Sequence, residues 1–93
     1  MAYEIVIKKR FFNKLARVLA YLEQEWGHAV AVAFLVKVDR RIASLKTHPF
    51  IGAPSARIKN VRGLHITKHN RMFYRVSGNK VIVLNLYDTR KNA

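Results

Sequence analysis

Basic and aromatic side chains gather in the C-terminal half of the sequence. They are Arg57, Lys59, Arg62, His65, Lys68, His69, Arg71, Tyr74, Arg75, Lys80, Tyr87, Arg90 and Lys91. Guanidinium and ammonium groups bind phosphate, and an arginine can hold two phosphate oxygens at once. An arginine can also stabilise the charge that develops when RNA is cleaved through its 2′-hydroxyl. This half of the chain therefore predicts a site for a polyanion, although any one of these residues could instead be a solvated edge charge.

Strand alternation separates some of these side chains into two faces. Side chains two residues apart share a face, so we expect one face to carry His69, Arg71, Phe73 and Arg75, and the other Met72, Tyr74 and Val76. If the Met72 face packs against helices, Arg71 and its neighbours lie on the open face. Arg71 is then placed to clamp a phosphate.

Other site chemistries have little support in the sequence. The chain has no cysteine, which excludes disulfides, thiolate nucleophiles and cysteine-based zinc sites. His65 and His69 are four residues apart but fall on a predicted strand and turn, and His28 and His48 are expected in loops, so we predict no metal site. The sequence has no glycine-rich phosphate loop and no convincing carboxylate pair, and we expect no small-molecule cofactor.

The charge balance points to anionic partners. Eighteen Lys and Arg residues stand against five Asp and Glu, which gives a formal net charge of +13 and a sequence pI near 10.9. Such an excess repels itself in a compact state unless phosphates or an acidic protein offset it. A surface kept basic only for solubility is the alternative.

The first half of the chain predicts one strand and two helices. Residues 3–8 are β-branched and predict a strand. Apolar residues then recur at helical spacing in two stripes, first Leu15, Val18, Leu19, Leu22 and Trp26, and then Val30, Phe34, Val38, Ile42 and Leu45. A single break at Gly27-His28 separates the stripes, and Pro49 closes the second. The two helices must therefore form a hairpin.

The second half predicts a surface loop followed by three strands. Residues 48–57 contain both prolines and are expected to form the loop. Strands are predicted at 61–67, 70–77 and 80–87, with a tight turn at Ser77-Gly78-Asn79. Residues 81–86 are apolar on both faces, which is typical of a central strand. The prediction is a single α+β domain over residues 1–93, of order β-α-α-β-β-β, with the hairpin packed on a small, mostly antiparallel sheet.

No apolar run approaches the roughly 18 residues that cross a bilayer, and the N-terminus lacks the apolar stretch of a signal peptide. We therefore expect a cytoplasmic protein without a membrane partner.

The element order and several short motifs resemble the RelE/ParE superfamily of toxins from bacterial type II toxin–antitoxin pairs. The resemblance rests on that order, on the Leu-His-Pro-x-x-Gly-like segment Leu45–Gly52, on the Arg-x-x-Tyr of Arg71–Tyr74 and on the apolar strand Val81–Leu86. It covers nearly the whole chain, and its weight comes from order and spacing together. It implies a toxin that a cognate acidic antitoxin wraps and neutralises.

In RelE-type members, the resemblance implies a metal-independent ribonuclease that cleaves messenger RNA in the ribosomal A site. Arg71 matches a catalytic arginine of that set, and Arg90 or Lys91 falls near a second basic position. The candidate catalytic residues are Arg71, Arg90, Tyr87, Lys68 and His65, and the candidate nucleic-acid-binding residues are Arg57, Lys59, Arg62, His69, Arg75 and Lys91.

Two other functions stay open. ParE-type members share the fold, lack the nuclease residues and act on DNA gyrase, and the positions matched here include no clear general acid. A non-toxic basic module that binds nucleic acid is the third reading.

Overall fold

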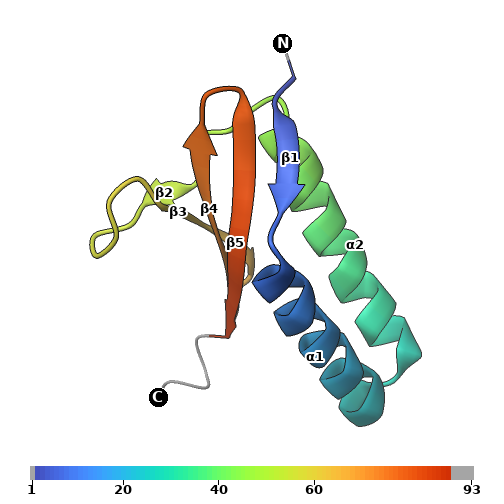
Figure 1. Ribbon diagram of the computed structural model, residues 1–93. Helices are drawn as coiled ribbons and strands as arrows, with labels where there is room; N and C mark the ends of the chain where they lie inside the picture. The colour runs from blue at the N-terminus through green and yellow to red at the C-terminus, as the bar shows by residue number, and fades with distance from the viewer. Residues whose placement is uncertain (1, 89–93) are drawn as a thin grey trace.

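The computed structural model describes residues 2–88. Its elements are β1 (Glu4–Ile7), α1 (Lys9–Trp26), α2 (His28–Leu45), β2 (Ala53–Pro54), β3 (Arg62–Thr67), β4 (Asn70–Ser77) and β5 (Lys80–Asp88). The two helices form a hairpin that packs on one face of a five-stranded sheet (Figure 1). The predicted α+β fold is confirmed. The two-residue strand β2 was not predicted and lies within the segment expected to be a loop.

The strand order is β1-β5-β4-β3-β2. The β1–β5 pair is parallel and the other three pairs are antiparallel. A parallel neighbour needs a long crossover, and the helical hairpin supplies it between β1 and the rest of the sheet. β5 lies between β1 and β4, so the prediction of a central strand is confirmed.

The helical hairpin turns at one residue. Gly27 has φ 99° and ψ 166°, a conformation that is essentially restricted to glycine. The prediction that His28 lies in a loop is wrong, because His28 is the first residue of α2. Its Nδ1 lies 3.1 Å from Oε2 of Glu23 across the turn, so the exposed pair links the two helices.

The core lies between the hairpin and the sheet. The buried residues of this cluster are Phe11, Phe34, Val38, Leu45, Ile66, Met72, Tyr74, Val81, Val83 and Leu86. Burial of one large apolar side chain stabilises a fold by about 1.5–3 kcal/mol, so this cluster holds the helices on the sheet. Met72 and Tyr74 face the helices, as expected, and the open face is therefore that of Arg71.

The segment between α2 and β2 is fastened to the sheet by two side chains. The backbone N–H of Gly52 donates to Oη of Tyr74 at 2.8 Å, in a buried hydrogen bond. Arg62 donates from Nη1 to the carbonyl oxygens of Phe50 at 3.2 Å and Gly52 at 2.8 Å. A Cβ at position 52 would lie 2.7 Å from Oη of Tyr74, which explains why a glycine ends the Leu45–Gly52 segment.

Neither of the two helices is long and apolar enough to cross a membrane.

Candidate nucleic-acid interface

Three predicted catalytic residues form a row across the open face of the sheet. Arg71 on β4 pairs with His65 on β3 and with Tyr87 on β5. Directly paired residues of antiparallel strands point to the same face, with Cβ atoms about 5 Å apart. Met72, the next residue after Arg71, is fully buried on the helical face, so the row lies on the opposite face. We call these residues the His65–Arg71–Tyr87 row.

A β-bulge puts Tyr87 in this row. The register shifts between Phe73 and Tyr74, which pair with Asn85 and Val83, so one extra residue enters β5. Without the extra residue, simple alternation from the buried Val83 would turn Tyr87 toward the helices. With it, Tyr87 faces outward and its side chain is exposed.

The guanidinium of Arg71 rests against the sheet. It lies over the ring of Phe73, with Cζ 5.4 Å from the ring centroid. The Phe73 ring in turn makes an edge contact with Tyr87, with centroids 6.2 Å apart and planes at 71°. Gly63 pairs with Phe73, and a Cβ there would lie 2.7 Å from Nη2 of Arg71. The glycine therefore leaves the space that the guanidinium occupies.

The Arg71 guanidinium has no compensating charge among the residues that the structure describes. Its Nε is buried and has no hydrogen-bond partner in the described part of the chain. A buried donor left unpaired costs about 1–3 kcal/mol, and such groups call for an explanation. Within residues 2–88, no carboxylate forms an ion pair with Arg71. The positive charge is therefore available to an external anion.

The row combines groups suited to phosphate chemistry. A guanidinium can stabilise charge on phosphorus, while an imidazole and a phenol can each donate or accept a proton. Within residues 2–88, no group of three His, Cys, Asp or Glu side chains could hold a metal ion.

The structure disperses the other predicted residues. Arg75 lies on β4, exposed on the same face as Arg71, and Lys68 is exposed in the turn between β3 and β4. Arg57 and Lys59 are exposed in the loop between β2 and β3. Arg62 pairs with the buried Tyr74 on the helical side of the sheet, where its guanidinium holds backbone carbonyls and lies over the Phe50 ring. Arg90 and Lys91 lie outside the described residues.

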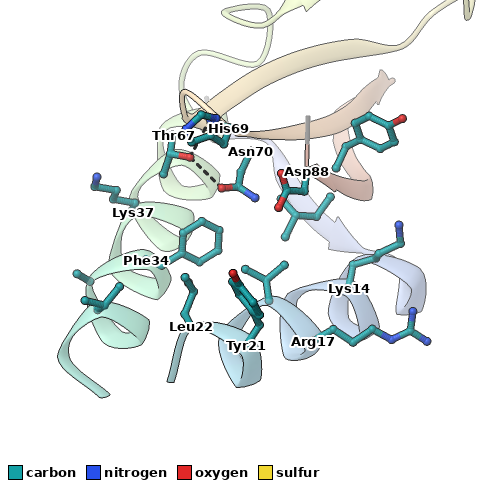
Figure 2. A pocket seen from close by; sticks show the side chains of 15 residues that line it. Lys14, Arg17, Tyr21, Leu22, Phe34, Lys37, Thr67, His69, Asn70 and Asp88 are labelled. Carbon is teal, nitrogen blue, oxygen red and sulfur yellow. Dashed lines mark hydrogen bonds between the residues drawn. The ribbon is translucent and has the colours of Figure 1, made fainter. Parts of the chain in front are cut away.

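The expectation that His69 shares a face with Arg71 is wrong. His69 lies in the turn before β4 begins, and its backbone N–H donates to Oγ1 of Thr67 at 3.2 Å. Figure 2 shows its side chain beside Thr67 and Asn70, at the rim of a groove between the helices and the end of the sheet. Strand alternation does not apply to a turn residue, so the two-residue spacing from Arg71 was misleading.

This groove was not predicted from the sequence. Its volume is about 810 Å³. Its apolar lining includes Val18, Leu22, Val30, Phe34 and Leu86. Figure 2 shows its charged lining, which includes Lys14, Arg17 and Lys37 and the carboxylate of Asp88. A signal was present in the sequence, because positions 14, 17, 18, 21 and 22 recur at helical spacing and join cations to apolar residues on one side of α1.

Comparison with known proteins agrees with this fold. A sequence model described as the ParE toxin of the type II toxin–antitoxin system parDE matches residues 5–93. The chromosomal ParDE system of P. aeruginosa superimposes with a TM-score of 0.81 at 16% identity, over 94% of this chain and 96% of that chain.

Other toxin–antitoxin structures also match. The E. coli DinJ-YafQ complex gives a TM-score of 0.70 at 8% identity, over 98% of this chain and 97% of that chain. The RelBE2 complex of Mycobacterium tuberculosis gives 0.64 at 15% identity, over 95% and 99%. No curated protein sequence matches the chain. The structural matches establish a common fold, and the sequence match spans nearly all of the chain, which therefore belongs to the ParE toxin family of type II toxin–antitoxin systems.

Proposed function

We propose that this toxin is a metal-independent endoribonuclease that acts on messenger RNA at the ribosome. The observation that carries the proposal is the His65–Arg71–Tyr87 row, in which a guanidinium without an ion-pair partner among residues 2–88 lies between two groups able to transfer protons. The row faces away from the helical hairpin, with His65 and Tyr87 exposed and Arg71 half-buried.

Each member of the row has a role in this mechanism. Arg71 binds the scissile phosphate and stabilises the charge of the pentacovalent transition state. His65 accepts the proton of the 2′-hydroxyl as the 2′-oxygen bonds to phosphorus. Tyr87 donates a proton to the leaving 5′-oxygen as the phosphorus–oxygen bond breaks. Lys68 and Arg75 are exposed and lie close to Arg71 in the sequence, and in this mechanism they contact the flanking phosphates.

Inhibition of DNA gyrase is the second candidate. It is supported by the match to the ParE family over residues 5–93 and by the TM-score of 0.81 with the P. aeruginosa ParDE structure. In this case the open face binds its target without cleaving it, and the proton-transfer groups of the row are not needed.

The groove between helices and sheet is proposed as the antitoxin site. An amphipathic helix fits its chemistry, with apolar side chains against Phe34 and Leu22 and acidic side chains against Lys14, Arg17 and Lys37. The net charge of +13 favours an acidic partner and fast association with it.

Expression of the isolated chain in bacteria tests the proposal. Mapping of RNA 5′ ends in cells that express the wild-type chain should show messenger RNA cut within translated codons. Arg71→Ala should reduce cutting by about two powers of ten or more, as loss of an oxyanion donor does. Arg40→Ala is the matched control, because this exposed arginine lies on α2 and has no role in the proposed site, and it should retain the cutting.

The transcripts of these strains and an assay with purified gyrase separate the two candidates. Intact transcripts, together with inhibition of the supercoiling activity of purified gyrase by the purified chain, would reject the nuclease and support gyrase inhibition. Undiminished cutting by a folded Arg71→Ala variant would remove Arg71 from the mechanism.

A further inference from the structure

The loop between β2 and β3, residues 55–61, projects from the edge of the sheet and away from the helical hairpin (Figure 1). We call it the 55–61 loop. The pairing of Pro54 with Arg62 closes its base. Val61, at the end of the loop, is 7% exposed and anchors it in the protein.

The loop is held in shape by its own hydrogen bonds. The backbone N–H of Ser55 donates to the carbonyl oxygen of Val61 at 2.7 Å. Oγ of Ser55 accepts from the N–H groups of Arg57 at 3.2 Å and Ile58 at 3.1 Å. Asn60 adopts a positive φ of 65°, which closes the turn. The tip is therefore ordered before any partner binds, which lowers the entropic cost of binding.

The tip presents one aliphatic side chain between two cations. Ile58 is 59% exposed, and Arg57 and Lys59 on either side of it are exposed as well. The acidic residues of the chain are at positions 4, 23, 25, 39 and 88, so none occurs from 40 to 87. The cations of the loop therefore have no acidic neighbour in the sequence.

We propose that the 55–61 loop is a second nucleic-acid contact, which binds the minor groove of double-stranded RNA. Arg57 and Lys59 contact phosphates, and Ile58 lies against the riboses between them. Proteins that enter the minor groove of DNA often insert an aliphatic side chain between base steps and kink the duplex. The minor groove of an RNA duplex is wide and shallow, so a short loop reaches it without bending the helix. The minor groove of DNA is only about 6 Å wide and admits such a loop only if the duplex is deformed.

This inference goes beyond the proposed function, because it concerns RNA binding without cleavage and at a separate place. Binding is therefore measured in the Arg71→Ala full-length chain, where the open-face arginine is absent. The probes are a fluorescein-labelled RNA duplex of 20 base pairs and a DNA duplex of the same sequence, with affinity measured by fluorescence anisotropy over a range of salt concentrations.

Two variants of this chain test the loop. Ile58→Ser should weaken binding of the RNA duplex by about tenfold and change binding of the DNA duplex much less. The double change Arg57→Gln and Lys59→Gln should lower the slope of log affinity against log salt by about 2, the value for two lost phosphate contacts. The matched controls are Ile51→Ser, at another exposed isoleucine, and Arg40→Gln, at an exposed arginine of α2, and both should bind the RNA duplex as the parent does.

Circular dichroism melts must show that all variants are folded. Unchanged RNA affinity of Ile58→Ser, or an equal loss with RNA and DNA duplexes, would overturn the proposal. The proposal would also be overturned if Ile58→Ser lost the complex with the purified antitoxin while its affinity for the RNA duplex was retained. The failure of the nuclease proposal would leave these measurements unaffected, because they involve no cleavage.

Discussion

The placement of the Arg71 guanidinium depends on two neighbouring residues. Phe73 supports its guanidinium from the same strand, and Gly63 leaves space for it on β3. A cation on an aromatic ring loses some of its freedom, so the charge is oriented before a ligand arrives. A lysine would keep the charge but lose the flat contact with Phe73 and the two-point grip on phosphate.

Gly63→Ala should therefore reduce toxin activity while leaving the fold largely intact. The new Cβ would lie 2.7 Å from Nη2 of Arg71, and the flexible end of that side chain is what must move. We expect growth inhibition to fall toward that of Arg71→Ala, with a melting temperature within a few degrees of wild type. In the double variant, Gly63→Ala should add nothing to Arg71→Ala. An additive loss would mean that Gly63 acts independently of Arg71.

Tyr74 predicts a dependence of stability on alkaline pH. Burial raises the pKa of its phenol above the ordinary 10.0, with the N–H of Gly52 and the charge of Arg62 opposing the shift. The folded protein thus keeps this proton at pH values where the unfolded chain has lost it. The resulting stabilisation is complete below pH 10 and is lost as pH rises through the raised pKa.

The measurement is urea unfolding of wild type and Tyr74→Phe at pH 9, 10 and 11. At pH 9, the variant should be less stable by about 1–3 kcal/mol, because the buried N–H of Gly52 loses its acceptor. This difference should shrink toward pH 11 as only the wild type loses the contribution of Tyr74. Parallel curves over the whole range would contradict the assignment.

At the scale of elements, the helical hairpin depends on one glycine. A Cβ at Gly27 would meet nothing within 4 Å, so crowding is not the constraint. The constraint is the backbone, because φ 99° with ψ 166° is unfavourable for any residue with a Cβ.

Gly27→Ala should therefore destabilise the protein by about 1–3 kcal/mol, measured by thermal unfolding. Gly27→Asn should cost about as much, because asparagine tolerates the left-handed helical region but not the extended ψ found here. A variant as stable as wild type would show that the hairpin can close in another backbone conformation.

At the scale of the whole molecule, cationic side chains lie on two surfaces, and only the groove combines them with an apolar floor. The open face carries Arg71 and Arg75, and the 55–61 loop extends cations beyond the edge of the sheet. The groove with its apolar floor lies between the helices and the sheet end. In our proposals, nucleic acid binds the open face and the antitoxin binds the groove, and the two surfaces meet at Tyr87, which belongs to the row and also lines the groove. An antitoxin in the groove would therefore block Tyr87 without having to cover Arg71.

RNA binding by the whole chain should depend steeply on salt. If six phosphates are contacted, affinity should fall by about three powers of ten between 50 and 200 mM salt. Fluorescence anisotropy with a labelled RNA is the measurement, and the Arg71→Ala chain allows it without cleavage. Affinity that hardly changes with salt would mean that the charge of +13 serves another purpose.

Local patterns were sufficient for most of the fold. The helical stripes, the break beside Gly27 and the tight turn before Lys80 each depend on residues close together in the chain. The phi angle of 58° at Gly78 matches the turn expected there. The excess of cations was likewise evident from composition, and the residue type of Arg71 supports the hypothesis that it binds phosphate.

Only the tertiary structure decided which of those cations work together. The bulge opposite Phe73 turns Tyr87 outward, and the contact with Gly52 occupies Arg62. The groove beside Phe34 needs both helices and the sheet end in place. Strand register and helix docking are set by contacts between segments that are distant in the sequence. The periodic pattern of one segment does not indicate which other segment it pairs or packs with. The sequence by itself therefore determined the elements and the charge, whereas the fold determined which side chains share a face.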